Sequence, residues 1–202
     1  MNLHLITITL AIISSIAQLE GNSEKINSST HAKFPMQQGI IQYQITGGAT
    51  GSATLAFDRN GWRSIEKRNV TLKRYGIESH ENRIEYIDGD YQYFINPDTK
   101  KGKQEVNKYW SGLLSYKDFE ASMKAIYENE SGTLLGMDSI LSKPCYKWTF
   151  EKGTIKELWI WRGIPLKIIK EVPGLTYEQL ATSISDEILT DPFSLPKDII
   201  WE

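Results

Sequence analysis

Histidine, cysteine and clustered carboxylates are the side chains best suited to metal or nucleophilic chemistry, and this chain of 202 residues has few such groups in useful spacing. Its three histidines, His4, His31 and His80, lie far apart, so we expect no site with several histidine ligands. His80 stands in "ESHE", which we interpret as the solvated end of a strand. Cys145 lies among aromatic residues, which favours a buried thiol over a reactive one.

Two glycine-containing turns resemble known ligand loops only superficially. "TGGATG" (46–51) leads into a predicted strand rather than a helix, so it does not predict a phosphate-binding loop. "DGD" (88–90) lacks the further ligands of a calcium loop, and no G-x-S-x-G motif occurs. We therefore expect no catalytic residues, no metal and no cofactor, and a protein that is not an enzyme.

The segment "ELWIWRGIPLKI" (157–168) raises a different question, because it is apolar on both faces of a predicted strand. Alternation places Trp159 and Trp161 on one face and Leu158 and Ile160 on the other. Three arrangements would cover both faces: a central strand under a helix, the wall of a curved sheet with an apolar lumen, or an oligomer interface.

One segment has helical periodicity and could cover such a strand. In "SYKDFEASMKAIYEN" (115–129), apolar residues recur at i, i+4, i+7 and i+8, and Ser115 with Asp118 resembles a capping box. We expect this helix to lie over Trp159 and Trp161 and to leave part of an apolar lumen open. The predicted ligand-binding residues are Phe119, Met123, Ile126, Trp148, Trp159 and Trp161.

The rest of the chain predicts antiparallel strands with short connections. Alternating apolar residues and turn signals such as "DRNG" and "DGD" indicate hairpins. We expect strands within 39–47, 52–68, 69–79, 82–98, 144–153, 154–163 and 164–174.

The end of the chain is harder to interpret. Residues 176–186 fit a helix, through Leu180, Ile184 and Ile188, or a strand, through alternation. In "DPFSLPKDIIWE" (191–202), two prolines predict no regular structure. No composition shift divides the mature chain, so we predict one domain over 37–202.

The first residues predict export. The apolar stretch from Leu5 to Ile13 is too short to span a bilayer, and small residues precede a cleavage site after Ala17. We expect a signal peptide over 1–17 and a polar, flexible leader over 18–36; the alternative is a buried N-terminal strand. One cysteine rules out an intramolecular disulfide, which fits a bacterial periplasm, and no cysteine near the cleavage site offers a point for lipid attachment.

The order of motifs along the chain resembles a known family. "W-x-W-x-G-I-P-L-K" at 159–167 precedes "A-T-S-I" at 181–184, and the chain closes on "F-x-x-P" at 193–196. "G-x-A-T-L-A-F-D-x-x-G" at 51–61 resembles a first hairpin. This pattern is similar to that of the periplasmic lipoprotein-carrier superfamily, the LolA/LolB-like half-barrels, over about residues 38 to 198.

The resemblance implies a mainly antiparallel β fold with few helices, in which a strongly curved half-barrel sheet has a helix plug on its concave side. It also favours a strand over the ambiguous 176–184 segment. It implies a lumen for an apolar ligand, such as an acyl chain, a lipid or a lipoprotein. The lid-locking arginine of that family has no assigned match here, and Arg63 and Arg68 are the candidates.

Together these observations predict a periplasmic, non-enzymatic binding or carrier protein for lipid or lipidated protein. We expect a monomer, and the net charge of −2 gives no reason to expect nucleic acid as a partner. The alternatives are an envelope protein-interaction or sensor module built on the same fold, and an envelope hydrolase with an unrecognised site.

Overall fold

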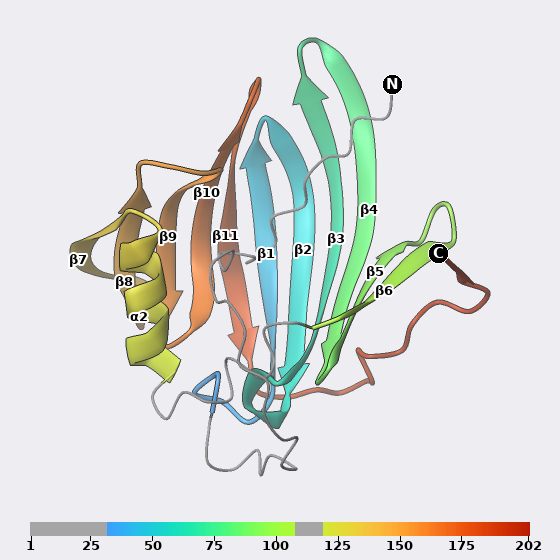
Figure 1. The fold of residues 1–202 in the computed structure, drawn as a ribbon, viewed down its shortest axis with the longest axis horizontal. Helices are drawn as coiled ribbons and strands as arrows, with labels where there is room; N and C mark the ends of the chain where they lie inside the picture. The colour runs from blue at the N-terminus through green and yellow to red at the C-terminus, as the bar shows by residue number, and fades with distance from the viewer. Residues whose placement is uncertain (1–31, 108–118) are drawn as a thin grey trace.

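A computed structural model describes residues 32–107 and 119–202. These residues form one curved sheet of twelve strands with a single α-helix, α2 (Phe119–Asn129), over it (Figure 1). The strands are β1 (Gly39–Gly47), β2 (Ala49–Asp58), β3 (Arg63–Arg74), β4 (Ile77–Asp88), β5 (Tyr91–Asn96), β6 (Lys101–Val106), β7 (Gly132–Ile140), β8 (Lys143–Phe150), β9 (Ile155–Trp161), β10 (Ile164–Val172), β11 (Leu175–Ser185) and β12 (Ile200–Trp201).

The strand order across the sheet is β12-β6-β5-β4-β3-β2-β1-β11-β10-β9-β8-β7. All neighbours are antiparallel except β12 and β6, and no pairing closes β7 onto β12 within the described residues. The expected fold class, a curved open half-barrel with one covering helix, is therefore confirmed.

The register defines two faces of this sheet, because residues directly opposite each other point the same way. We call the face that carries α2 the helix face. Its members are found by following direct partners from strand to strand: Trp148, Leu158, Ile168, Gln179, Ile45, Gly51, Val70 and Glu81. The opposite face we call the tail face, because the C-terminal segment packs on it.

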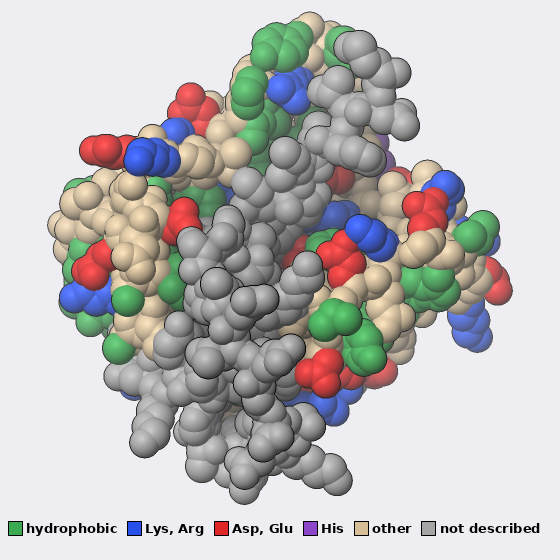
Figure 2. Space-filling view, viewed as in Figure 1, with side chains coloured by type: hydrophobic (Ala, Val, Ile, Leu, Met, Phe, Trp, Pro, Cys, Tyr) green, Lys and Arg blue, Asp and Glu red, His purple; other side chains and the backbone are tan. Residues whose placement is uncertain are grey.

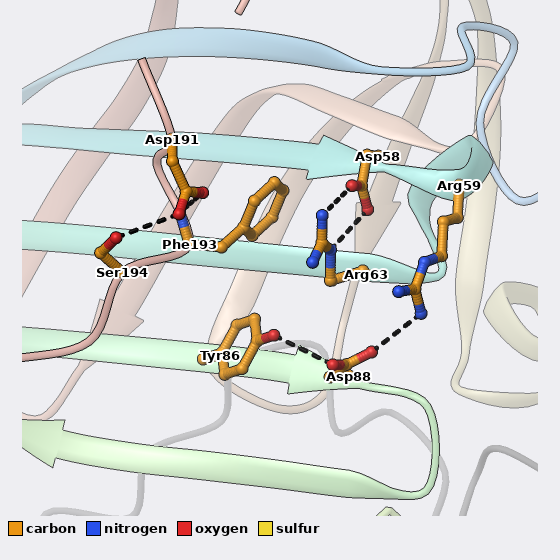
Figure 3. A network of polar contacts seen from close by, with 8 residues as sticks. All are labelled: Asp58, Arg59, Arg63, Tyr86, Asp88, Asp191, Phe193 and Ser194. Carbon is orange, nitrogen blue, oxygen red and sulfur yellow. Dashed lines mark hydrogen bonds and ion pairs between the residues drawn. The ribbon is translucent and has the colours of Figure 1, made fainter.

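The tail face is closed over β3–β5 by residues 186–199. Phe193, Leu195 and Ile199 pack against a cluster of buried isoleucines that includes Ile65 and Ile84. The Arg63 guanidinium lies 4.1 Å from the Phe193 ring centroid and also pairs with Asp58 (Figure 3).

Further contacts hold the two ends of this network. Arg59 pairs with Asp88, which also accepts a hydrogen bond from the Tyr86 hydroxyl. The Asp191 carboxylate accepts bonds from the Phe193 N–H and the Ser194 hydroxyl, both at 3.0 Å (Figure 3). The tail is thus fixed by side chains although it is mostly irregular.

Several expectations about the elements are settled by these strands. Residues 176–184 lie within β11, as the resemblance implied. The expectation of no regular structure over 191–202 is partly wrong, because Ile200 and Trp201 form β12. Both prolines precede this pair, so its backbone can form hydrogen bonds with β6. Phe34, which falls within the expected leader, is buried with its ring 4.7 Å from that of Phe57. Residues 1–17, most of the leader and Ser115 lie outside the described residues.

Candidate functional site

The sheet curves toward the helix face, and a hydrogen bond made by Arg68 shows the extent of this curvature. Arg68 lies on β3 and donates a 2.8 Å hydrogen bond to the amide oxygen of Gln179 on β11, although β2 and β1 lie between these strands. Three flat strand spacings would separate the two residues by about 14 Å. An arginine side chain crosses that gap only if the sheet bends toward this face, so the helix face is the concave one.

Small side chains on β2 leave the space that Arg68 occupies. Its direct partner on β2 is Ala53, and Gly51 and Ala49 follow on the same face. Ala49 and Ala53 are fully buried, and a Cβ on Gly51 would lie only 2.2 Å from the backbone oxygen of Asn69. The floor between β3 and β11 is therefore low enough for a guanidinium to lie across it.

Arg68 is the centre of a charged network on the concave face. Its Nε lies 3.7 Å from the Glu81 carboxylate, which also lies 3.9 Å from Arg83. Its guanidinium carbon lies 5.2 Å from the ring centroid of Tyr177. Burial raises the pKa of Tyr177, and the nearby Arg68 charge opposes that shift. The concave face thus carries a network of paired charges, which lies beside the buried apolar residues of β1–β3.

Lys170 on β10 belongs to the same region, since it is the direct partner of Tyr177. Burial lowers the pKa of Lys170 to about 8, and the positive charges of Arg68 and Arg83 act in the same direction. Glu66 and Glu85 partly offset this shift. A cation at this position is disfavoured relative to the unfolded chain.

The concave face has two apolar parts. One is a buried cluster on β1–β3 that includes Ile45, Ala53 and Val70, and the other lies at one end of the sheet, under α2. Met123 and Tyr127 of the helix are buried against Trp148, Leu158 and Ile160. The ring centroid of Tyr127 lies 5.4 Å from that of Trp148, and burial raises the pKa of its phenol. The helix therefore packs by aromatic and aliphatic contacts, as its periodicity predicts.

A pocket of about 310 Å³ opens between α2, the outer strands and the β9–β10 hairpin. This volume is at the lower end of the range of about 300–1,000 Å³ that is usual for ligand pockets. It is lined by Ala121, Met123, Lys124, Tyr127, Leu134, Tyr146, Trp148, Ile160, Arg162 and Gly163. The wall is mainly apolar and aromatic, which suits an acyl chain or another apolar group.

Three of the six predicted site residues come together here. Met123 and Trp148 line the pocket, and Ile126 packs at the edge of the same cluster. The side chain of Phe119 lies outside the described residues.

The structure does not place Trp159 and Trp161 under α2, where we expected them, and neither lines the pocket. Trp148 is the direct partner of Leu158, so Leu158 and Ile160 face the helix and Trp159 faces the other way. Trp161 belongs to the separate core cluster that contains Cys145 and not to the cluster of α2. Alternation along a strand tells which residues share a face, but it does not tell which of the two faces packs against the helix.

Trp159 has polar and charged neighbours on the tail face. Its indole N–H donates a 2.6 Å hydrogen bond to Glu157, and the ammonium groups of Lys147 and Lys167 lie 5.1 and 5.4 Å from its ring centroid. Glu157 pairs with Lys147 at 3.3 Å. Glu157 has the same parity as Trp159, and this polar neighbour was the signal in the sequence that could have excluded Trp159 from a lumen.

The two arginines considered as matches for the lid-locking arginine lie on opposite faces. Arg63 is on the tail face, beside Phe193, whereas Arg68 is on the concave face. Within the described ranges, no group of three His, Cys, Asp or Glu side chains could hold a metal ion. Over those same ranges, the helices lack the length and hydrophobicity that a bilayer-spanning segment needs.

The fold is similar to that of an uncharacterised conserved protein from Thermus thermophilus, with a TM-score of 0.51 and 12% identity over 83% of this chain and 91% of that chain. That likeness shows the fold. LprF from Mycobacterium bovis (TM-score 0.36, 10% identity, 80% of this chain and 91% of that chain) and the lipoprotein LppX from Mycobacterium tuberculosis (0.34, 12%, 78% and 91%) match too remotely to inform function. The sequence matches no protein-family model and no curated protein.

Arg68→Ala tests whether the charged network stabilises the curled sheet. The variant loses the bond to Gln179 and leaves Glu81 with a single, longer contact to Arg83, so we expect unfolding to become easier by about 2–4 kcal/mol. Urea unfolding followed by circular dichroism measures this. The control is Arg59→Ala, whose exposed pair with Asp88 should contribute less than about 1 kcal/mol. Equal losses in the two variants would contradict a structural role for Arg68.

Lys170→Met tests the burial of that amine through pH. The folded chain releases this proton at about pH 8 and the unfolded chain near its ordinary value of 10.5, so the wild type gains stability as the pH rises between these values. We therefore expect Lys170→Met to be more stable than the wild type by about 1–3 kcal/mol at pH 7, and this advantage to shrink toward pH 10.5. Lys73→Met, at an exposed site, is the control. An advantage that stays constant with pH would disprove the assignment.

Proposed function

We propose that this protein is an exported envelope protein that binds, and in the manner of a carrier releases, a lipid or another ligand with an apolar chain. The observation that carries the proposal is the apolar pocket under α2, whose wall includes Met123, Leu134 and Trp148. Each buried methylene of a ligand would contribute about 0.8 kcal/mol, so a modest chain could support micromolar binding after the costs of association. Binding alone needs no catalytic group, and the proposal includes none.

The concave face limits what the ligand can be. A wide acyl-filled lumen would require an open apolar floor, but Arg68, with its partners Glu81 and Gln179, lies across the face over β1 and β2. Acyl chains laid over these groups would take their remaining exposed polar atoms out of water without offering replacement partners, which is costly. We therefore propose a ligand whose apolar part enters the pocket under α2 rather than one that fills the whole half-barrel.

A second candidate function is favoured by β7. This strand pairs with β8 on one side, and within the described residues no strand pairs with its other side. Leu135 and Met137 on it are 56% and 61% exposed. An open, partly apolar edge is a template for strand addition by a partner protein. Native mass spectrometry separates the candidates, since bound lipid supports the first and a stable protein complex the second.

Ala121→Trp tests the pocket. Ala121 is exposed on α2 and lines the pocket, so the indole should occupy the ligand's space without disturbing the buried side of the helix. We expect binding of a fluorescent fatty-acid probe to weaken by at least about tenfold, which corresponds to about 1.4 kcal/mol. Ala125→Trp is the matched control, because Ala125 is exposed on the same helix and does not line the pocket. No probe binding by the wild type, or equal binding by both variants, would overturn the proposal.

Export is a separate part of the proposal and has its own test. The apolar stretch from Leu5 to Ile13 is followed by small residues at Ser15 and Ala17, so we expect a mature protein that begins at Gln18. Mass spectrometry of the protein isolated from the envelope fraction of a Gram-negative host measures the N-terminus. An intact Met1 in that fraction would remove the periplasmic assignment.

A further inference from the structure

The charged residues that line the pocket all have the same sign. Lys124 from α2 and Arg162 from the β9–β10 hairpin lie on its wall, and no acidic side chain of the described residues does. Both are exposed, so they stand at the mouth of the pocket rather than in its apolar interior. Lys124 also lies near Glu128, at 3.9 Å on the same helix, which is a long and exposed ion pair. Such a pair contributes little, so Lys124 remains available to another anion.

Arg162 differs from the other arginines of the chain. Arg59, Arg63, Arg68 and Arg83 each lie within 4.0 Å of a carboxylate, and Arg74 lies over the ring of Tyr75. Among the described residues, Arg162 has no such ion-pair, hydrogen-bond or ring partner for its side chain. A guanidinium presents five N–H donors in a fork that matches a carboxylate or a phosphate. The pocket mouth therefore holds an unpaired anion-binding group.

The position of Arg162 in the chain is unusual as well. Trp161 and Ile164 are paired, so Arg162 and Gly163 form a two-residue hairpin turn, with φ values of 46° and 88°. Two positive φ values are the mark of a type I′ turn, which strongly prefers Asn, Asp or Gly at its first central position. Arginine is not favoured there, because a side chain with a Cβ is strained at positive φ. Asparagine would fit this turn better than arginine, but it would place no positive charge at the pocket.

We propose that the pocket selects an anionic amphiphile, with the apolar chain under α2 and a carboxylate or phosphate head between Arg162 and Lys124. This inference rests on the proposed function and names the ligand class of the same pocket. The head stays at the wet mouth, so it is not stripped of water, while the two cations attract it. The paired charges of the concave face, such as Arg68 with Glu81, have partners of their own. On the side of the molecule drawn in Figure 2, exposed basic and acidic side chains are interspersed.

The test uses a fluorescent fatty acid and its uncharged methyl ester as paired probes. Wild-type protein should bind the acid more tightly than the ester, and added salt should weaken binding of the acid alone. In Arg162→Asn the acid should lose about three- to thirtyfold in affinity while the ester is unchanged. Because asparagine suits the turn, this variant should be at least as stable as the wild type, so loss of binding cannot be attributed to unfolding.

Lys152→Asn is the matched control, since it removes one positive charge from an exposed turn that does not line the pocket. It should bind both probes as the wild type does. Equal binding of acid and ester by the wild type, or an unchanged acid affinity in Arg162→Asn, would overturn the inference and leave the proposed function standing. Failure of both probes to bind would instead overturn the proposed function itself.

The source of the head group is decided by competition. Displacement of the fatty-acid probe by lysophosphatidylglycerol more readily than by unlabelled fatty acid would assign the head to a lipid phosphate, and the reverse order would assign it to a carboxylate. Either order supports an anionic head. Displacement of the probe by a long-chain alcohol as readily as by both anions would contradict it.

Discussion

The pairing of Leu158 with Trp148 and Ile168 is the constraint on which the rest of the site depends. Residues that face each other across neighbouring strands share a side of the sheet, so this register sends Leu158 and Ile160 toward α2. It also sends Trp159 to the other side, among Lys147, Glu157 and Lys167. A shift of one residue in the pairing would exchange these two environments and place a charged cluster under an apolar helix. The helix and the sheet therefore specify the register together.

The curl of the sheet is controlled by a second feature, the low floor of β2. Gly51 and Ala53 allow Arg68 to reach β11, and the bond to Gln179 joins the two halves of the concave face. Larger residues at these positions would fill the floor with apolar side chains and keep the halves apart. The chain thus has a charged bridge in place of an open apolar lumen. The apolar ligand that we propose therefore fits at one end of the half-barrel, where the aromatic side chains of Tyr127 and Trp148 meet.

The sequence predicts what depends on local pattern. Alternation, hairpin turns and helical spacing indicate the helix and most of the strands, although β6 and β7 lie outside the predicted strand ranges. Parity correctly separates Trp159 from Leu158 and Ile160. Alternation does not tell which of the two faces packs against α2, because that is a contact between distant parts of the chain. The buried Arg68 network was also missed, since it joins residues 111 positions apart and no local pattern marks it. Glu157 beside Trp159 was the one local signal that could have corrected the site.

The two edges of the sheet differ in what covers them, and the pocket lies beside one of these edges. At one edge β12 pairs with β6, and Glu202 pairs with Lys101, so the C-terminus covers that edge. At the other edge β7 has no strand beyond it within the described residues, and its Leu134 also lines the pocket. An edge strand held on one side only is easier to displace than an inner strand, because fewer ladder bonds must open. The wall of the pocket proposed to bind the ligand thus includes an edge strand, while the bond from Arg68 to Gln179 joins the inner strands.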